Sequence, residues 1–109
     1  MNVYDEAHSL AKAIKESNEF KEFDRMRKAV DDDKETSEML KELTELQMQL
    51  QTAQVVGQQP DKDLFARYQS LNTMAMTKPL AMQYLQAQFA LATMMNDVFG
   101  IVGEAINVK

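Results

Sequence analysis

The chain has 109 residues, of which 45% are apolar and 27% are charged, and its formal net charge is −5. This length suits one domain with a modest core, so we expect a single helical domain over residues 1–109. With no cysteine in the chain, disulfides, iron–sulfur clusters and thiolate zinc sites are excluded, and the negative charge opposes generic binding to nucleic-acid phosphates.

Two short helices are expected at the N-terminal end. The first has Asn2 as its cap and an apolar stripe with helical spacing at Val3, Ala7, Leu10 and Ile14. Apolar residues then resume out of phase at Phe20, Phe23, Met26 and Val30. Because serine caps helices well, this change of phase predicts a break at Ser17.

The middle of the chain predicts an antiparallel helical hairpin of residues 33–56 and 61–77. Asp33 and Asp61 are expected to cap the two helices, and Gly57 and Pro60 mark the turn between them. The first helix has a heptad seam at Thr36, Met39, Leu43, Leu46, Leu50 and Ala53. The second continues that spacing at Leu64, Tyr68, Leu71 and Ala75, so these seams should face each other.

A long last helix is expected from Pro79 to about Asn107, on the order of 43 Å in length. Its first apolar stripe is Ala81, Leu85, Gln88, Ala92, Met95, Phe99, Val102 and Ile106. Its second, adjacent stripe is Leu80, Tyr84, Ala87, Leu91, Met94, Val98, Ile101 and Ala105. Residues 79–96 carry no charge over about the length of a membrane span, but the interrupting glutamines and the sided pattern favour a soluble helix, and no membrane partner is expected.

The apolar face of this last helix is too wide for one neighbour, since two adjacent stripes span roughly 160°. We therefore expect a homodimer, whose self-association residues are Leu91, Met95, Val98, Phe99 and Val102. The alternative is that the two N-terminal helices fold back and cover the same strip within one chain.

No arrangement typical of an active site is found in the sequence. His8 is the only histidine, and one histidine without cysteine makes a poor metal site, so neither metal nor cofactor is expected. The helically spaced carboxylates Glu35, Glu38, Glu42 and Glu45 border the heptad seam and are interpreted as a solvated edge. The basic residues Lys21, Arg25, Arg27 and Lys28 alternate with acidic ones and are interpreted as intrahelical pairs.

The order of these segments resembles a known family. HSLAKAIKESNEFKEFDRMRKAV is followed by an acidic break, the helix MLKELTELQMQLQ, a turn from Gly57 to Pro60, and KPLAMQYLQAQFALATMMNDVFGIVGEAI. Together they look like the YlbF/YmcA-like family of small helical bacterial proteins, in its YheA-type branch. The resemblance implies a cytoplasmic, all-α, dimeric protein. Some relatives act in complexes that regulate competence, biofilm formation, sporulation and RNA processing, and certain of them supply cysteines to iron–sulfur clusters, which this chain cannot do.

Two hypotheses of function follow. The first is a non-enzymatic interaction protein, a bundle-like helical homodimer that offers helical surfaces to an unknown protein partner. The second is an RNA-associated accessory factor in RNA processing or developmental regulation, whose basic residues on the second short helix contact nucleic acid. Salt-sensitive binding of RNA distinguishes the two.

Overall fold

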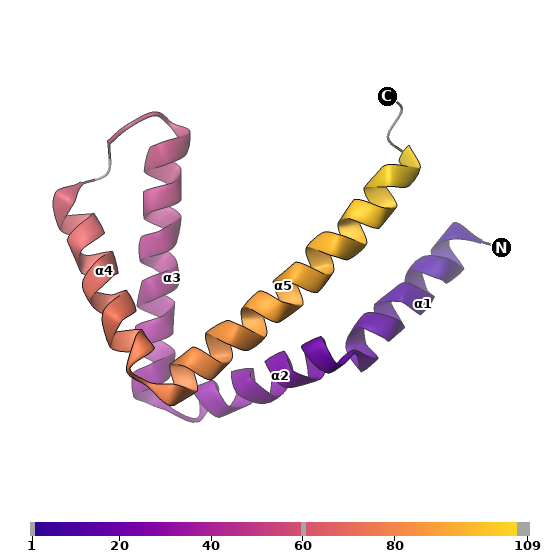
Figure 1. Ribbon diagram of the computed structural model, residues 1–109, viewed down its shortest axis with the longest axis horizontal. Helices are drawn as coiled ribbons and strands as arrows, with labels where there is room; N and C mark the ends of the chain where they lie inside the picture. Colours follow the sequence, from indigo (N-terminus) through magenta and orange to yellow (C-terminus); the bar gives the residue numbers. More distant parts are fainter. Residues whose placement is uncertain (1, 60, 107–109) are drawn as a thin grey trace. The chain divides into compact units, whose positions relative to one another are not determined.

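The computed structural model describes residues 2–59 and 61–106 of the chain, and helices account for 89% of these residues (Figure 1). No strand occurs within this described part. The helices are α1 (Val3–Glu16), α2 (Asn18–Asp31), α3 (Lys34–Val55), α4 (Lys62–Met76) and α5 (Pro79–Ile106). The predicted all-α class and order of elements are confirmed. Pro60 and Asn107, named above as part of a turn and as a helix end, lie outside the described residues.

Ser17 separates α1 from α2 and caps both helices. Its backbone is extended, with φ −68° and ψ 152°, which ends α1. Its hydroxyl donates to the Ile14 carbonyl at 2.6 Å and accepts from the Phe20 N–H at 3.1 Å. One side chain therefore satisfies a terminal carbonyl of one helix and a terminal N–H of the next, which is why the break falls at this residue.

The other helix starts follow the predicted local chemistry. Asp33 accepts from the Thr36 N–H at the start of α3, and Asp61 accepts from the Asp63 N–H at the start of α4. Pro79 is the first residue of α5, where a missing N–H removes no helical hydrogen bond. Beyond α3 the chain turns at Gly57, whose φ of 76° is the left-handed conformation that glycine adopts without strain.

The chain divides into two compact units, which are described separately. Residues 28–83 form the hairpin unit, and the residues up to Arg27 together with those from Tyr84 onward form the terminal unit. The boundaries fall inside α2 and α5. The expectation of a single domain over residues 1–109 stays a prediction.

In the hairpin unit, α3 and α4 pack against each other in opposite directions (Figure 1). The buried residues of the pair are Thr36, Met39, Leu40, Leu43 and Leu46 from α3 and Ala75 from α4. Leu50, Leu64, Tyr68 and Leu71, also predicted to lie in the seam, are half-buried. The structure thus contains the predicted antiparallel hairpin, whose apolar core lies along the heptad positions.

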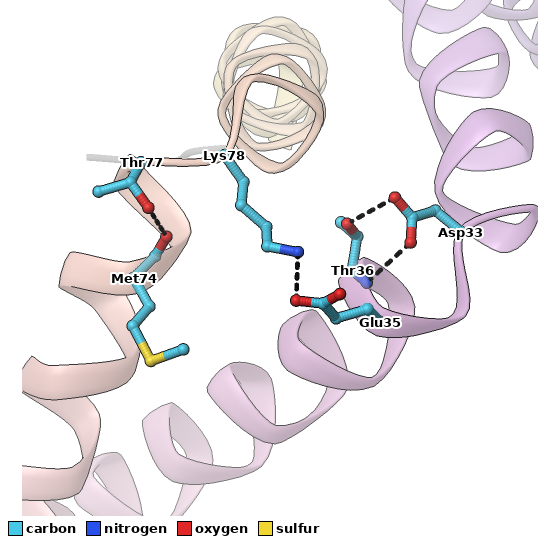
Figure 2. A network of polar contacts seen from close by, with 6 residues as sticks. All are labelled: Asp33, Glu35, Thr36, Met74, Thr77 and Lys78. Atoms are coloured by element: carbon cyan, nitrogen blue, oxygen red, sulfur yellow. Dashed lines mark hydrogen bonds and ion pairs between the residues drawn. The ribbon is translucent and has the colours of Figure 1, made fainter.

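Polar contacts hold the base of the hairpin (Figure 2). Thr36 is 1% exposed, and its hydroxyl donates to the Asp33 carboxylate at 3.1 Å, so this buried polar group has a partner. Lys78, between α4 and α5, forms an ion pair of 2.6 Å with Glu35 in the first turn of α3. This contact ties the end of α4 to the start of α3.

Candidate functional site

The terminal unit contains a helix that the rest of the described chain does not cover. α1 has no buried residue, although Val3, Ala7, Leu10 and Ile14 share one face at helical spacing. Val3 is 81% exposed and Ile14 is half-buried. Amphipathic helices in globular proteins owe most of their stability to packing of their apolar face, so α1 lacks the packing partner that its sequence pattern requires.

Within the same unit, α2 contacts the beginning of the α5 segment. The rings of Phe23 and Tyr84 have centroids 5.6 Å apart and are tilted by 39°, a separation typical of favourable aromatic pairs. Met26 is 1% exposed and Ala87 is 6% exposed, so the best-covered residues of this unit lie close to that ring pair in the sequence. The most deeply buried residues of the terminal unit therefore belong to α2 and to the beginning of the α5 segment.

The five predicted self-association residues lie further along α5. Leu91, Met95 and Val98 are half-buried, whereas Phe99 is 62% exposed and Val102 is 51% exposed. At about 100° per residue, all five fall within an arc of about 100° on the helix surface. α5 thus brings them together on one face by its own geometry, and that face grows more exposed toward the C-terminal end.

The remaining surface of α5 is also largely apolar. Ile101 and Ile106 are 68% and 77% exposed. The polar face is narrow, and the residues it holds are Gln83, Gln86, Thr93, Asp97 and Glu104. The two adjacent stripes expected from the sequence therefore both exist on α5, and both become exposed from Phe99 onward.

The alternative in which the N-terminal helices fold back over the strip is not the arrangement in the structure. The ribbons of α1 and α5 belong to the same unit and stay apart along their lengths (Figure 1). α1 buries nothing, and Phe99 and Val102 of α5 remain exposed. Phe23 of α2 contacts Tyr84 of α5, before the predicted strip begins at Leu91.

The histidine and the carboxylates along the edge of α3 face solvent. His8 is exposed, and the described residues contain no group of three histidine, cysteine, aspartate or glutamate side chains that could hold a metal ion. Along the edge of α3, Glu42 pairs with Arg67 of α4 at 2.8 Å. Exposed carboxylates paired with cations lack the dry, concave setting that separates the pKa values of an acid and a base.

Two of the four basic residues of α2, Arg25 and Arg27, form pairs within their own helix, as the sequence pattern indicated. Arg25 pairs with Glu22 at 2.5 Å, and Arg27 pairs with Asp24 at 2.6 Å. The hydrogen bond from Arg25 holds the pKa of Glu22 below its ordinary value and raises the pKa of Arg25. A helix face with its arginines neutralised in this way does not favour contact with nucleic-acid phosphates.

A second apolar surface, at the turn of the hairpin, was not expected from the sequence. Met48, Val55 and Val56 are 61%, 85% and 60% exposed. A shallow hollow of about 400 Å³ is lined there by Met48, Gln49, Thr52, Ala53, Val56 and Gln58. Met48 and Val55 lie seven residues apart and outside the heptad seam, so the sequence shows that they share a face but not that this face stays exposed.

α5 is also long and apolar enough, by length and composition alone, to cross a membrane. Its qualifying window has a mean hydropathy of 1.3 and is not buried in the structure. Core helices of water-soluble proteins pass the same test. The high mean hydropathy of α5 and its exposed stripes arise from the same apolar residues.

Comparison with known proteins places the chain among bacterial relatives. It is 32% identical to a UPF0342 protein of Caldicellulosiruptor saccharolyticus, covering 99% of this chain and 90% of that one. It is also 32% identical to a UPF0342 protein of Streptococcus mutans, covering 94% of this chain and 90% of the relative.

Two solved structures share the fold, each at 18% sequence identity and 95% coverage of this chain. One is a protein of unknown function (DUF964) from Bacillus stearothermophilus, with a TM-score of 0.81 and 91% of its chain covered. The other is Bacillus subtilis RicA in complex with RicF, with a TM-score of 0.64 and 92% covered.

A family model confirms the resemblance inferred from the sequence, while the YheA-type branch stays a prediction. The model describes the control of competence regulator ComK, YlbF/YmcA, and matches residues 3–107. With helices in the predicted order and a match over nearly its whole length, the chain belongs to the YlbF/YmcA family.

Proposed function

We propose that this chain is a non-enzymatic, cytoplasmic accessory protein that regulates through protein contacts and forms a homodimer through α5. The observation that carries the proposal is the exposed apolar face of that helix, with Phe99 62% and Val102 51% exposed. Contiguous apolar patches of this kind on a protein surface mark sites of protein interaction.

A second copy of the chain is the simplest cover for this face. A two-fold interface uses the same patch on both subunits, and a straight helix with an apolar stripe is complementary to its own copy. An added Cβ at Gly100 or Gly103 would meet no atom within 4 Å, so the flank beside Phe99 is open to a neighbouring backbone. The family supports a role in complexes, since the RicA structure was determined with RicF bound to it.

We propose that the protein is not an enzyme because its charged side chains form exposed ion pairs. The ion pairs of α2 and of the hairpin join exposed side chains, and such pairs contribute little to stability or to chemistry. Asp97 and Glu104, the charged residues of α5, lie on its narrow polar face. Each would cost about 2.5–3.5 kcal/mol near the centre of a bilayer, which favours a protein neighbour for α5 over lipid.

Sedimentation equilibrium tests the dimer. We expect twice the chain mass of 12.5 kDa for the native protein at micromolar concentration. Phe99→Glu should weaken association by at least about tenfold, because it places an unpaired carboxylate in an apolar interface. Thr93→Glu, which adds the same charge on the polar face of the same helix, is the matched control and should dimerise normally.

Two results would overturn the proposal. A 12.5 kDa monomer at tens of micromolar protein would show that α5 does not mediate self-association. Flotation of the native protein with phosphatidylglycerol vesicles, abolished by Phe99→Glu and not by Thr93→Glu, would assign the apolar face of α5 to a membrane surface instead.

A further inference from the structure

One partner helix cannot cover both stripes of α5. The strip of the proposed dimer follows the first stripe, through Met95, Phe99 and Val102. In the second stripe, Tyr84 contacts Phe23 of α2 and Ala87 is 6% exposed. Of the continuation of this stripe, Met94 and Val98 are half-buried, whereas Ile101 is 68% exposed and Ala105 is exposed. A dimer held by α5 alone would leave this part of the helix bare.

We propose that α1 of the partner subunit packs along this second stripe, so that the two subunits exchange their N-terminal helices; the inference rests on the dimer proposed above. α1 is the other apolar face of the terminal unit that lacks a neighbour, since it buries no residue. The interface would be a bundle of four helices, consisting of α1 and α5 from each subunit.

The two faces match in spacing and in length. Val3, Ala7, Leu10 and Ile14 of α1 are spaced four, three and four residues apart, and so are Met94, Val98, Ile101 and Ala105 of α5. Equal spacing of this kind is what pairs helices in a knobs-into-holes seam. The stripe of α1 from Val3 to Ile14 and the stripe of α5 from Met94 to Ala105 each span 12 residues, or about 18 Å.

The direction of pairing follows from symmetry. Within the terminal unit, α1 and α5 run in opposite directions (Figure 1). If the two copies of α5 are antiparallel about the two-fold axis, the partner's α1 runs parallel to α5 of the first subunit. Val3 of the partner subunit then lies at the Met94 end of the stripe, and Leu10 of the partner subunit lies beside Ile101.

The break at Ser17 makes the exchange sterically reasonable. Because the extended backbone of Ser17 interrupts the helix, α1 is not a continuation of α2 and does not follow the direction in which α2 packs against Tyr84. Capping of both helix ends by the Ser17 hydroxyl stabilises this change of direction. α1 is therefore a separate helix whose apolar face is available for packing against a second subunit.

Disulfide trapping tests the exchange directly, because the native chain has no cysteine. The full-length double variant Leu10→Cys with Ile101→Cys is oxidised gently and analysed on a non-reducing gel. Exchange predicts a covalent dimer, since a disulfide requires the two Cα atoms to lie within about 7 Å. The control pair Leu10→Cys with Thr93→Cys, which moves the second thiol to the polar face of α5, should form no such band.

Equilibrium measurements provide an independent readout of the same contact. Leu10→Asp should raise the dimer dissociation constant by at least about tenfold, and Ser9→Asp, on the polar side of α1, should leave it within about twofold. An intrachain disulfide in the double variant would overturn the exchange in favour of fold-back within one subunit. A native dimer without any Leu10–Ile101 disulfide would overturn the exchange and leave the α5 dimer standing, whereas a native monomer would overturn both.

Discussion

Leu46→Ala probes the hairpin at a buried leucine of the heptad seam. Leu46 is 3% exposed in α3, and the substitution removes about three carbon groups, each worth about 0.8 kcal/mol of transfer free energy. The cavity left behind adds to this loss, and buried Leu→Ala changes cost about 2–5 kcal/mol in total. Because the hairpin pairs only two helices along this seam, its neighbours can partly close the cavity, so we expect about 2–3 kcal/mol.

Urea unfolding followed by far-UV circular dichroism measures this change. A loss of about 2–3 kcal/mol is a large share of the 5–15 kcal/mol by which domains are typically stable, so the midpoint should fall clearly. Met48→Ala is the matched control, since Met48 lies in the same helix and is 61% exposed. All variants are compared at one protein concentration, because dimerisation contributes to apparent stability. If Leu46→Ala and Met48→Ala shift the midpoint equally little, the heptad seam does not form the core of this hairpin.

Three further predictions concern α1, α2 and their junction. Ser17→Ala should cost about 0.5–2 kcal/mol in urea unfolding, whereas Ser9→Ala inside α1 should be neutral or slightly stabilising; equal effects would show that the Ser17 hydroxyl does not cap. Arg25 lowers the pKa of Glu22 in the folded chain, so their pairing stabilises the fold above the ordinary glutamate pKa and is lost as the pH falls through the lowered value. Glu22→Gln should therefore be slightly less stable than the native protein near neutral pH and equally stable in acid, and a difference that grows on acidification would contradict this sign. Finally, micromolar protein should not retard single-stranded RNA in a gel at low salt, and salt-sensitive binding would revive the RNA-associated hypothesis.

The sequence alone determined where the helices begin and end. Ser17, Asp33 and Asp61 act on N–H groups two or three residues away, and Pro79 acts through its own ring. These effects are local, so they operate in the same way whatever the tertiary structure is. The hairpin was also predictable, because two heptad seams joined by a short turn have few other ways to bury their apolar positions.

Only the tertiary structure shows which apolar helix faces are covered by a neighbour. Helical spacing shows that Phe99 and Val102 share a face and that Leu10 and Ile14 share another, but the same pattern fits a neighbour in the chain or in a second subunit. The structure shows that Phe23 of α2 packs against Tyr84 of α5, that α1 has no buried residue, and that Phe99 and Val102 stay exposed. The apolar surface around Met48 at the hairpin turn was likewise missed, because its residues lie outside the seam and only packing reveals which off-seam residues stay exposed. Sequence periodicity fixes the direction in which a side chain leaves its helix, whereas the identity of its neighbour depends on the path of the whole chain.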